Sequence, residues 1–319
     1  MNLDLLTNEQ STSPRMLNIG CGRRYHRDWV NIDLEASDPA VIRHDVTKGL
    51  PFERCKFSAV YHSHVLEHLE PNQGRSLIHE CFRVLKPGGI LRIVVPDLEC
   101  IARLYLETHS RALSGDEASK VNYNWMKLEL LDQLVRKSSG GRMGRYMASR
   151  EIKNSEFVRA RVGDELSICQ TQAQDPSPQP RSFYQRIAKS TLDVRKKITR
   201  EVVRLVLGAE AKRAFDEGMF RNQGEIHRWM YDRFSLRELT ESIGFVDFKV
   251  CAADESGIEN YSTYELDSVG ELVRKPDSIF VECRRPAPIP ASVAVGNSIH
   301  ESPQRSPMPR ESGMVKKAR

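Results

Sequence analysis

The stretch "LNIGCGRRYHRDWVNIDLE", residues 17–35, decides the fold of this chain. Arg15–Ile19 and Trp29–Leu34 are short apolar runs that are predicted to form strands, and Gly20 and Gly22 directly follow the first run. Because glycine has no Cβ, a turn built from it lets the backbone approach a ligand closely. Two glycines one residue apart are a weak motif by themselves, so a plain turn is the alternative.

The spacing within this stretch argues against a dinucleotide site. Dinucleotide-binding turns carry a third glycine, where this chain has Tyr25, and an acid about 20 residues further on. Here Asp33 follows Gly22 by eleven residues, and only nine residues, 20–28, join the two strands. That connection is too short for a full crossover helix. The turn therefore suits a nucleoside without a pyrophosphate, whose ribose diol the Asp33 carboxylate can bind.

Strands and helices alternate on both sides of a long middle segment. The remaining predicted strands are Ala40–His44, Phe57–His62, Ile90–Asp97, Phe245–Ala252 and Ser278–Cys283. The predicted helices are Gln73–Leu85, ended by Lys86–Gly89, and Ser235–Ile243, with Ser235 as its N-cap. This alternation predicts an α/β fold with a mainly parallel sheet. Ligands of such sheets bind at the carboxyl ends of the strands.

The middle segment, residues 98–224, has helical patterns and no convincing strand, which predicts a large helical insertion that serves as a lid or substrate module. The predicted domains are a 1–14 extension, an α/β core in two parts (15–97 and 225–285), the 98–224 insertion and a disordered 286–319 tail. The tail holds six of the sixteen prolines and no aromatic residue, so it cannot bury enough apolar surface to fold.

Composition and charge restrict the class of protein. No apolar run approaches the length of a membrane span, and the seven cysteines show no paired spacing. These features predict a cytoplasmic protein. The net charge is only +5, but residues 136–213 carry eighteen Lys/Arg against eight Asp/Glu. This excess predicts contact with something acidic.

Four pieces of the chain resemble class I S-adenosylmethionine (SAM) dependent methyltransferases in order and spacing. They are "LNIGCG" with "NIDLE", "HDVTKGLPF" (44–52), "SAVYHSHVLEHL" (58–69) and "RVLKPGGILRIVVPD" (83–97). The resemblance implies a Rossmann-like fold with an antiparallel last strand and SAM as the cofactor. It implies that SAM is bound by Asn18, Gly20, Cys21, Gly22, Asp33, Leu34, Asp45, Val46 and His64.

"HRWMYD" (227–232) and "RKPDSIFVE" (274–282) are similar to segments of predicted methyltransferases encoded beside bacterial glycosyltransferases in polysaccharide clusters. That resemblance implies O-methylation of a sugar or glycan acceptor in surface polysaccharide biosynthesis. A non-catalytic SAM-fold protein that binds a glycosyltransferase is the alternative. A dehydrogenase is disfavoured by the missing third glycine. Sequence-specific nucleic-acid binding is not expected, because no supporting aromatic motif is present.

The stretch "HSHVLEH", residues 62–68, could hold a metal. His64, Glu67 and His68 fit H-x-x-E-H, but zinc proteases carry this pattern on a long helix, whereas here it follows a strand. The stretch also resembles the E-x-x-E-H metal motif of ubiquinone-pathway and small-RNA O-methyltransferases, with His64 in place of the first Glu. Imidazole would favour Mn, Fe, Ni or Zn over Mg²⁺. The favoured interpretation is that His64 lies along the SAM methionine arm and His68 lines the substrate pocket.

A catalytic base is needed if the acceptor is a sugar hydroxyl, which does not ionise at neutral pH. The candidates are His68, Asp97 and His227, although Asp97 could instead cap the next helix. The basic segment 183–215 predicts one amphipathic helix. That helix is interpreted first as a lid and second as peripheral contact with an anionic membrane, which suits a lipid-linked sugar.

Overall fold

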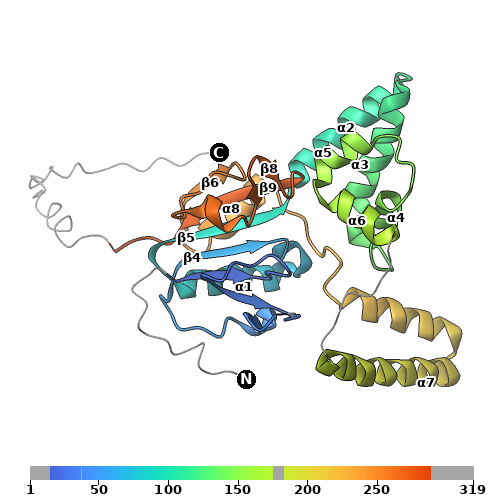
Figure 1. The fold of residues 1–319 in the computed structure, drawn as a ribbon, viewed down its shortest axis with the longest axis horizontal. Helices are drawn as coiled ribbons and strands as arrows, with labels where there is room; N and C mark the ends of the chain where they lie inside the picture. The colour runs from blue at the N-terminus through green and yellow to red at the C-terminus, as the bar shows by residue number, and fades with distance from the viewer. Residues whose placement is uncertain (1–14, 37, 175–182, 289–319) are drawn as a thin grey trace, which may run out of the picture. The chain divides into compact units, whose positions relative to one another are not determined.

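A seven-stranded sheet forms the centre of the fold (Figure 1). The computed structural model describes residues 15–36, 38–174 and 183–288, with side chains outside 174–194. The strand order is β3-β2-β1-β4-β5-β9-β6. The strands are β1 (Met16–Ile19), β2 (Trp29–Asp33), β3 (Val41–Arg43), β4 (Phe57–Ser63), β5 (Leu85–Pro96), β6 (Val246–Cys251) and β9 (Ser278–Arg284). A separate two-stranded ribbon pairs β7 (Ser268–Val269) with β8 (Leu272–Val273).

The pairing confirms the predicted mainly parallel sheet with an antiparallel last strand. Strands β3, β2, β1, β4 and β5 pair in parallel, whereas β9 is antiparallel to both of its neighbours. The predicted strand bounds are close to the observed ones, with one exception. The segment Lys86–Gly89 was predicted only to end a helix, but it lies inside β5, where the pairing with β4 is irregular. Gly88 has φ 78° and its N–H donates to the Arg285 carbonyl, so this bend remains paired.

One face of the sheet is covered by α1 (Pro71–Val84) and α8 (Arg233–Glu241). Helix α1 directs Leu77, Ile78, Cys81 and Val84 into a core shared with β1, β4 and β5. Each buried aliphatic side chain stabilises the fold by about 1.5–3 kcal/mol. The predicted start of this helix at Gln73 was two residues late, because Pro71 occupies the first turn and Gln73 completes a capping box.

The predicted N-cap of the second covering helix, α8, was wrong. Asp232 caps the helix by accepting a hydrogen bond from the Ser235 amide, and the Asp232 amide donates to the Ser235 hydroxyl oxygen. Asp232 is therefore the N-cap, and Ser235 is the third residue of the capping box. Gly244 follows the helix with φ 109°, as its predicted position past the end requires.

The other face of the sheet is covered near β5 and β9 by the segment 253–267, which includes the short helix η4 (Tyr261–Tyr264). Arg92 of β5 is fully buried and joins this segment to the sheet. Its Nε donates to Asp267 Oδ2 at 2.8 Å, and its Nη1 donates to Glu282 Oε1 at 2.8 Å. The hydroxyls of Tyr61 and Tyr261 donate to the two oxygens of Asp267. A buried charge is tolerated only when it is paired in this way.

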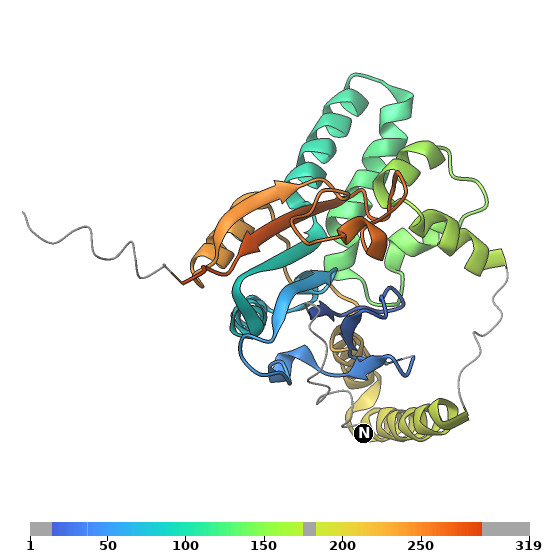
Figure 2. The ribbon, with the colours of Figure 1, turned by 60° about the vertical axis from the view of Figure 1, so that its left-hand side comes forward.

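The described part of residues 98–221 contains helices and their connecting loops but no strand. They are α2 (Leu98–Leu113), α3 (Glu117–Val135), α4 (Gly141–Met147), α5 (Ser155–Val162), α6 (Glu165–Gln174) and α7 (Phe183–Arg221). Helices α2 to α6 surround a core of their own, in which Trp125 and Met126 are fully buried (Figures 1 and 2). Arg161 and Glu129 form a buried ion pair within it, with Nη2 2.6 Å from Oε1. Among the described residues no helix is long and apolar enough to span a bilayer.

The single amphipathic helix predicted over 183–215 is instead a helical hairpin. Gly208 has φ 87° and ψ 179°, which are not helical values, so α7 breaks there and its two arms lie side by side (Figures 1 and 2). Arg200 of the first arm pairs with Asp216 of the second. Glycine adopts this positive φ without the steric penalty of other residues, which is why the reversal occurs at this position.

The chain divides into two units, Met1–Pro286 and Ala287–Arg319. The elements above all belong to the first unit. The predicted 1–14 extension and nearly all of the predicted disordered tail lie outside the described residues.

Candidate functional site

The two glycines after β1 have different roles. Both are left-handed, with φ 65° at Gly20 and 54° at Gly22. A Cβ on Gly20 would lie 2.3 Å from Cγ2 of Val65, whereas a Cβ on Gly22 would meet nothing within 4 Å. Gly20 is therefore required by packing against the loop after β4. Both glycines were predicted to let a ligand approach the backbone. Only Gly22 has the open space that such an approach needs.

The connection from β1 to β2 contains no helix, as its length predicted. Two buried asparagines hold it. Asn18 Nδ2 donates to the Arg24 carbonyl at 3.1 Å, and Asn31 Nδ2 donates to the carbonyls of His26 and Trp29 at 2.9 and 2.7 Å. These side-chain amides pair carbonyl groups of the connection and of the first residue of β2.

The Asp33 carboxylate ties the glycine turn to the end of β2. Its Oδ2 accepts from the Gly22 amide and its Oδ1 accepts from the Glu35 amide, both at 2.8 Å. Each carboxylate oxygen has two lone pairs, so both oxygens can accept a further bond from a diol. Leu34, the next predicted contact, is exposed.

Asp45 follows the neighbouring strand β3 and caps the short helix η2 (Val46–Lys48). Its Oδ1 accepts from the amide and the hydroxyl of Thr47, at 3.1 and 2.6 Å. The hydroxyl bond is the main cause that lowers the pKa of Asp45. Because β2 and β3 are parallel neighbours, Asp33 and Asp45 lie at the same edge of the sheet. The predicted SAM contact Val46 begins η2.

A cavity of about 320 Å³ opens beside this turn. Four predicted cofactor residues line it, namely Asn18, Gly20, Cys21 and His64; the others, Gly22, Asp33, Leu34, Asp45 and Val46, do not. The lining residues that the sequence did not predict are Arg24, Tyr61, Ser63, Asp164, Glu165, Ile168, Leu266, Asp267, Arg274, Lys275 and Phe280. Burial, and then Asp33, raise the pKa of the Cys21 thiol to about 12, so the thiol stays protonated at neutral pH.

Basic side chains line one part of this cavity. Lys275 pairs with Glu165 at the start of α6. The buried Nε of Arg274 has no hydrogen-bond partner within the described part of the chain. Burial, and then the charge of Arg24, lower the pKa of Arg274. Two guanidinium groups therefore lie at this wall, in a lining that also includes the carboxylates of Asp164, Glu165 and Asp267. In the sequence, the adjacent basic residues Arg274 and Lys275 at the start of "RKPDSIFVE" could have indicated this basic part of the cavity.

Glu67, in the short helix η3 (Leu66–His68), is fully buried behind His64. Nδ1 of His64 lies 3.0 Å from Glu67 Oε1. Burial acts to raise the pKa of Glu67, but the histidines around it, His64 first, lower it to about 2. The Glu67 backbone carbonyl accepts from the amides of Arg228 and Trp229, at 2.7 and 3.2 Å. These bonds bring residues 226–231 against the loop after β4.

His227 therefore joins His68 and Glu67, and their ligand atoms all lie within 4.8 Å of one another. His68 Nδ1 is 3.2 Å from the Ile226 carbonyl, a contact that requires the proton on Nδ1 and leaves Nε2 facing Glu67 Oε1 at 4.0 Å. Burial lowers the pKa of His227 to about 3, so its ring is neutral.

This group differs from the predicted metal ligands, His64, Glu67 and His68. Both ring nitrogens of His64 are already engaged, Nδ1 with Glu67 and Nε2 with the Ser278 hydroxyl at 2.9 Å. His227 takes its place as the third member of the group. Neither His68 nor His227 lines the cavity, whereas His64 lines it and also contacts Glu67.

Asp97, the third predicted base, acts as a helix cap. Its Oδ1 accepts from the Cys100 amide at 3.2 Å at the start of α2. Its own amide donates to the Asp277 carbonyl at 3.0 Å. Asp97 does not line the cavity. These contacts support the capping interpretation of Asp97. A cap of this type stabilises a helix by about 1 kcal/mol.

Comparison with known proteins agrees with this arrangement. Residues 13–93 match the family model described as "Methyltransferase domain". No curated protein matches the chain. Similar solved structures include a SAM-dependent methyltransferase from Archaeoglobus fulgidus (13% identity, 88% of this chain and 90% of that chain, TM-score 0.32) and one from Thermotoga maritima (11%, 86% and 84%, 0.32).

A third similar structure is 1,6-didemethyltoxoflavin-N1-methyltransferase from Burkholderia thailandensis, crystallised with S-adenosylhomocysteine (17% identity, 30% of this chain, TM-score 0.23). The chain spans 50% of that protein, and matches to two further structures span 43% and 59% of theirs. Residues 13–93 are thus similar to methyltransferase domains, and the mainly parallel sheet with its antiparallel strand β9 has a Rossmann-like fold.

Proposed function

We propose that the protein is a SAM-dependent methyltransferase that transfers a methyl group to an oxygen of a sugar or glycan. The observation that carries the methyltransferase assignment is the bond from the Gly22 amide to Asp33 inside the matched domain. It places a carboxylate with free lone pairs beside a turn that has open space. The turn and this carboxylate follow the carboxyl ends of β1 and β2, where ligands of such sheets bind.

The residues present fit SAM. Asp33 would accept the ribose hydroxyls, and the edge near Asp45 would hold the adenine ring. The cavity beyond Gly20, which His64 lines, would take the methionine arm. When bound, SAM supplies an electrophilic methyl group. The cavity then has to hold an acceptor oxygen in line with that group, and positioning of this kind can contribute up to about 7–11 kcal/mol.

The cavity lining supports an acceptor that carries negative charge. Arg24 and Arg274 present guanidinium groups, whereas the lining carboxylates of Glu165 and Asp267 are already paired with Lys275 and Arg92. The helical insertion contributes Asp164 and, from α6, Glu165 and Ile168. A sugar phosphate or a nucleotide sugar has the charge that this wall would bind. We therefore propose that the insertion selects the acceptor while the α/β core binds SAM. The role in surface polysaccharide synthesis and the cytoplasmic location stay predictions.

Asp33→Ala is expected to weaken S-adenosylhomocysteine binding by about 10- to 150-fold, which corresponds to roughly 1.5–3 kcal/mol for a hydrogen bond to a charged group. The wild type should bind this ligand and SAM more tightly than NAD or ATP in calorimetry. Asp28→Ala, which removes an exposed acid from the same connection, is the matched control. Tighter binding of NAD than of SAM would refute the proposed function.

A divalent metal at Glu67, His68 and His227 is a second proposal. Oε2 of Glu67 and Nδ1 of His227 are buried without hydrogen-bond partners within the described part of the chain, while Glu67 Oε1 contacts His64 Nδ1 at 3.0 Å. Imidazole and carboxylate donors suit Zn²⁺ or Mn²⁺. EDTA should then abolish methyl transfer, and added Zn²⁺ or Mn²⁺ should restore it. Glu67→Gln should lower the metal content in elemental analysis. Full activity in EDTA, without bound metal, would instead show a metal-free histidine cluster.

Acceptor identity can be tested with methyl-labelled SAM and a panel of nucleotide sugars and sugar phosphates. Product formation that depends on the negative charge of the acceptor, detected by mass spectrometry, is the expected result. Arg274→Gln should raise the acceptor KM. Binding of SAM without transfer to any member, together with capture of a glycosyltransferase, would favour the non-catalytic alternative.

A further inference from the structure

The turn of the α7 hairpin exposes large apolar side chains. Leu205, Val206 and Leu207 directly precede the break at Gly208 and are 76%, 73% and 68% exposed. Ile198 and Val202 on the same arm are 59% and 52% exposed. Ile198, Val202 and Leu205 are spaced four and three residues apart, so they lie along one side of the arm. This stripe and the Leu205–Leu207 tip form a continuous apolar surface that water contacts.

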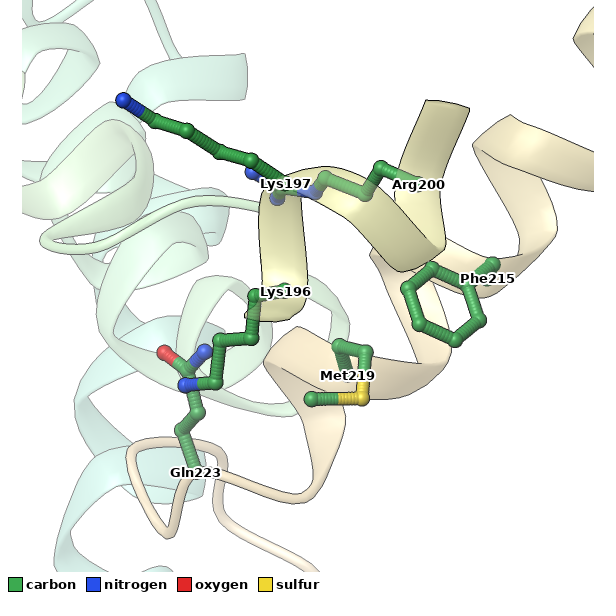
Figure 3. A pocket seen from close by; sticks show the side chains of 6 residues that line it. All are labelled: Lys196, Lys197, Arg200, Phe215, Met219 and Gln223. Atoms are coloured by element: carbon green, nitrogen blue, oxygen red, sulfur yellow. The ribbon is translucent and has the colours of Figure 1, made fainter. Parts of the chain in front are cut away.

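The packing between the two arms does not use this surface. The space between them, about 280 Å³, is lined by Lys196, Lys197, Arg200, Phe215, Met219 and Gln223. In Figure 3, Lys196 of the first arm extends toward Gln223, whereas Lys197 points away from Phe215 and Met219 of the second arm. The space between the arms is thus lined by residues other than those of the stripe and tip. The exposed stripe and tip remain available for a partner.

Positive charge accompanies this apolar surface. Residues 195–213 contain seven Lys/Arg and two Asp/Glu. Arg200 and Lys212 share Asp216, and Arg204 pairs with Glu201. Arg195, Lys196, Lys197 and Arg213 form no ion pair with any described residue. The apolar tip, together with cations that pair with no described residue, fits a partner that has an apolar interior beneath an anionic surface.

We infer that the α7 hairpin docks on an anionic lipid surface, with Leu205–Leu207 inserted among the acyl chains and the basic side chains at the headgroups. The charge favours lipid over a protein partner, because each cation near an anionic membrane adds about 1 kcal/mol of attraction. Interfacial helices combine an apolar side with Lys and Arg in this manner. The inference does not rest on methyltransferase activity, although it would bring the enzyme to a lipid-linked acceptor.

The test is co-sedimentation of the full-length protein with vesicles of phosphatidylcholine containing phosphatidylglycerol, and with vesicles of phosphatidylcholine alone. The wild type should bind the anionic vesicles more tightly, and binding should fall with added salt. Leu205→Glu with Val206→Glu should weaken binding at least tenfold, since burying each apolar side chain is worth about 1.5–3 kcal/mol. Leu113→Glu is the matched control, because Leu113 ends α2 and is also 76% exposed.

A second variant tests the charges without touching the tip. Replacing Arg195 and Arg213, which are exposed and do not line the space between the arms, with Gln should weaken binding about fivefold for each charge removed and flatten its salt dependence. Arg200 is left in place because it joins the arms. Circular dichroism and S-adenosylhomocysteine affinity should not change. Equal vesicle binding by wild type and the Leu205/Val206 variant would overturn the inference. So would concentration-dependent dimerisation that this variant abolishes while vesicles remain unbound.

Discussion

Arg92→Leu is expected to lower the free energy of unfolding by about 3–5 kcal/mol, because it leaves the carboxylates of Asp267 and Glu282 buried without their partner. Arg92 has no exposed surface, and it also donates to the carbonyls of Ala252, Ala253 and Glu255. The loss would release the segment that covers this face of the sheet. Urea unfolding of the two proteins measures the difference.

Arg233→Leu is the control for Arg92→Leu, since Arg233 forms an exposed pair with Glu99 and such pairs contribute about 0–1 kcal/mol. Replacing Arg92, Asp267 and Glu282 together with apolar residues should restore much of the stability, because no buried charge is then unpaired. The same unfolding midpoint for Arg92→Leu and Arg233→Leu would show that the buried network contributes nothing special. Asp267, Arg274 and Lys275 line the cavity, so ligand affinity should fall with the single variant as well.

Gly20→Ala is expected to destabilise the protein by about 2–5 kcal/mol. Overpacking against Cγ2 of Val65, 2.3 Å from the new Cβ, costs about 1–3 kcal/mol. The left-handed backbone at φ 65° adds about 1–2 kcal/mol for a residue with a Cβ. Chemical denaturation measures the total.

Gly22→Ala is the matched control for Gly20→Ala, because it has a similar φ of 54° but open space around the Cβ. Its free energy of unfolding should fall by only about 1–2 kcal/mol, the cost of the left-handed backbone for a residue with a Cβ. Its S-adenosylhomocysteine affinity should fall if the open space belongs to the cofactor. Adding Val65→Ala to Gly20→Ala should relieve part of the clash, seen as a non-additive double-mutant cycle. Equal destabilisation by both single alanines would mean that Val65 moves aside freely.

Local patterns in the sequence were sufficient for the main elements. The apolar run "ILRIVVPD" predicted the central strand, the nine-residue connection predicted the absence of a first crossover helix, and the ordered motifs predicted the sheet with its antiparallel last strand. The strand and the short connection depend on periodicity and spacing over a few residues, whereas the antiparallel last strand was implied by the resemblance to methyltransferases. Asp33 belongs with them, because its position at a strand end depends only on the strand before it.

The composition of the site depended on tertiary structure. Val65 lies 45 residues from Gly20 and occupies the space of its missing Cβ, so the role of that glycine could not be predicted from the turn alone. His227 meets His68 from 159 positions further along the chain, and it takes the place of His64 in the group of possible metal ligands. Arg274 and Lys275 reach the cavity only because β9 pairs beside β5.

The sequence by itself therefore determined the class of fold, the position of Asp33 at the end of a strand and the basic character of the insertion. Tertiary structure alone decided which side chains face one another. It also decided the course of the chain at Gly208, where one backbone conformation makes a hairpin of the predicted long helix. The physical reason is range. Secondary structure follows from interactions between near neighbours, whereas a site gathers residues through strand order and packing, to which each residue contributes only a small part of the free energy.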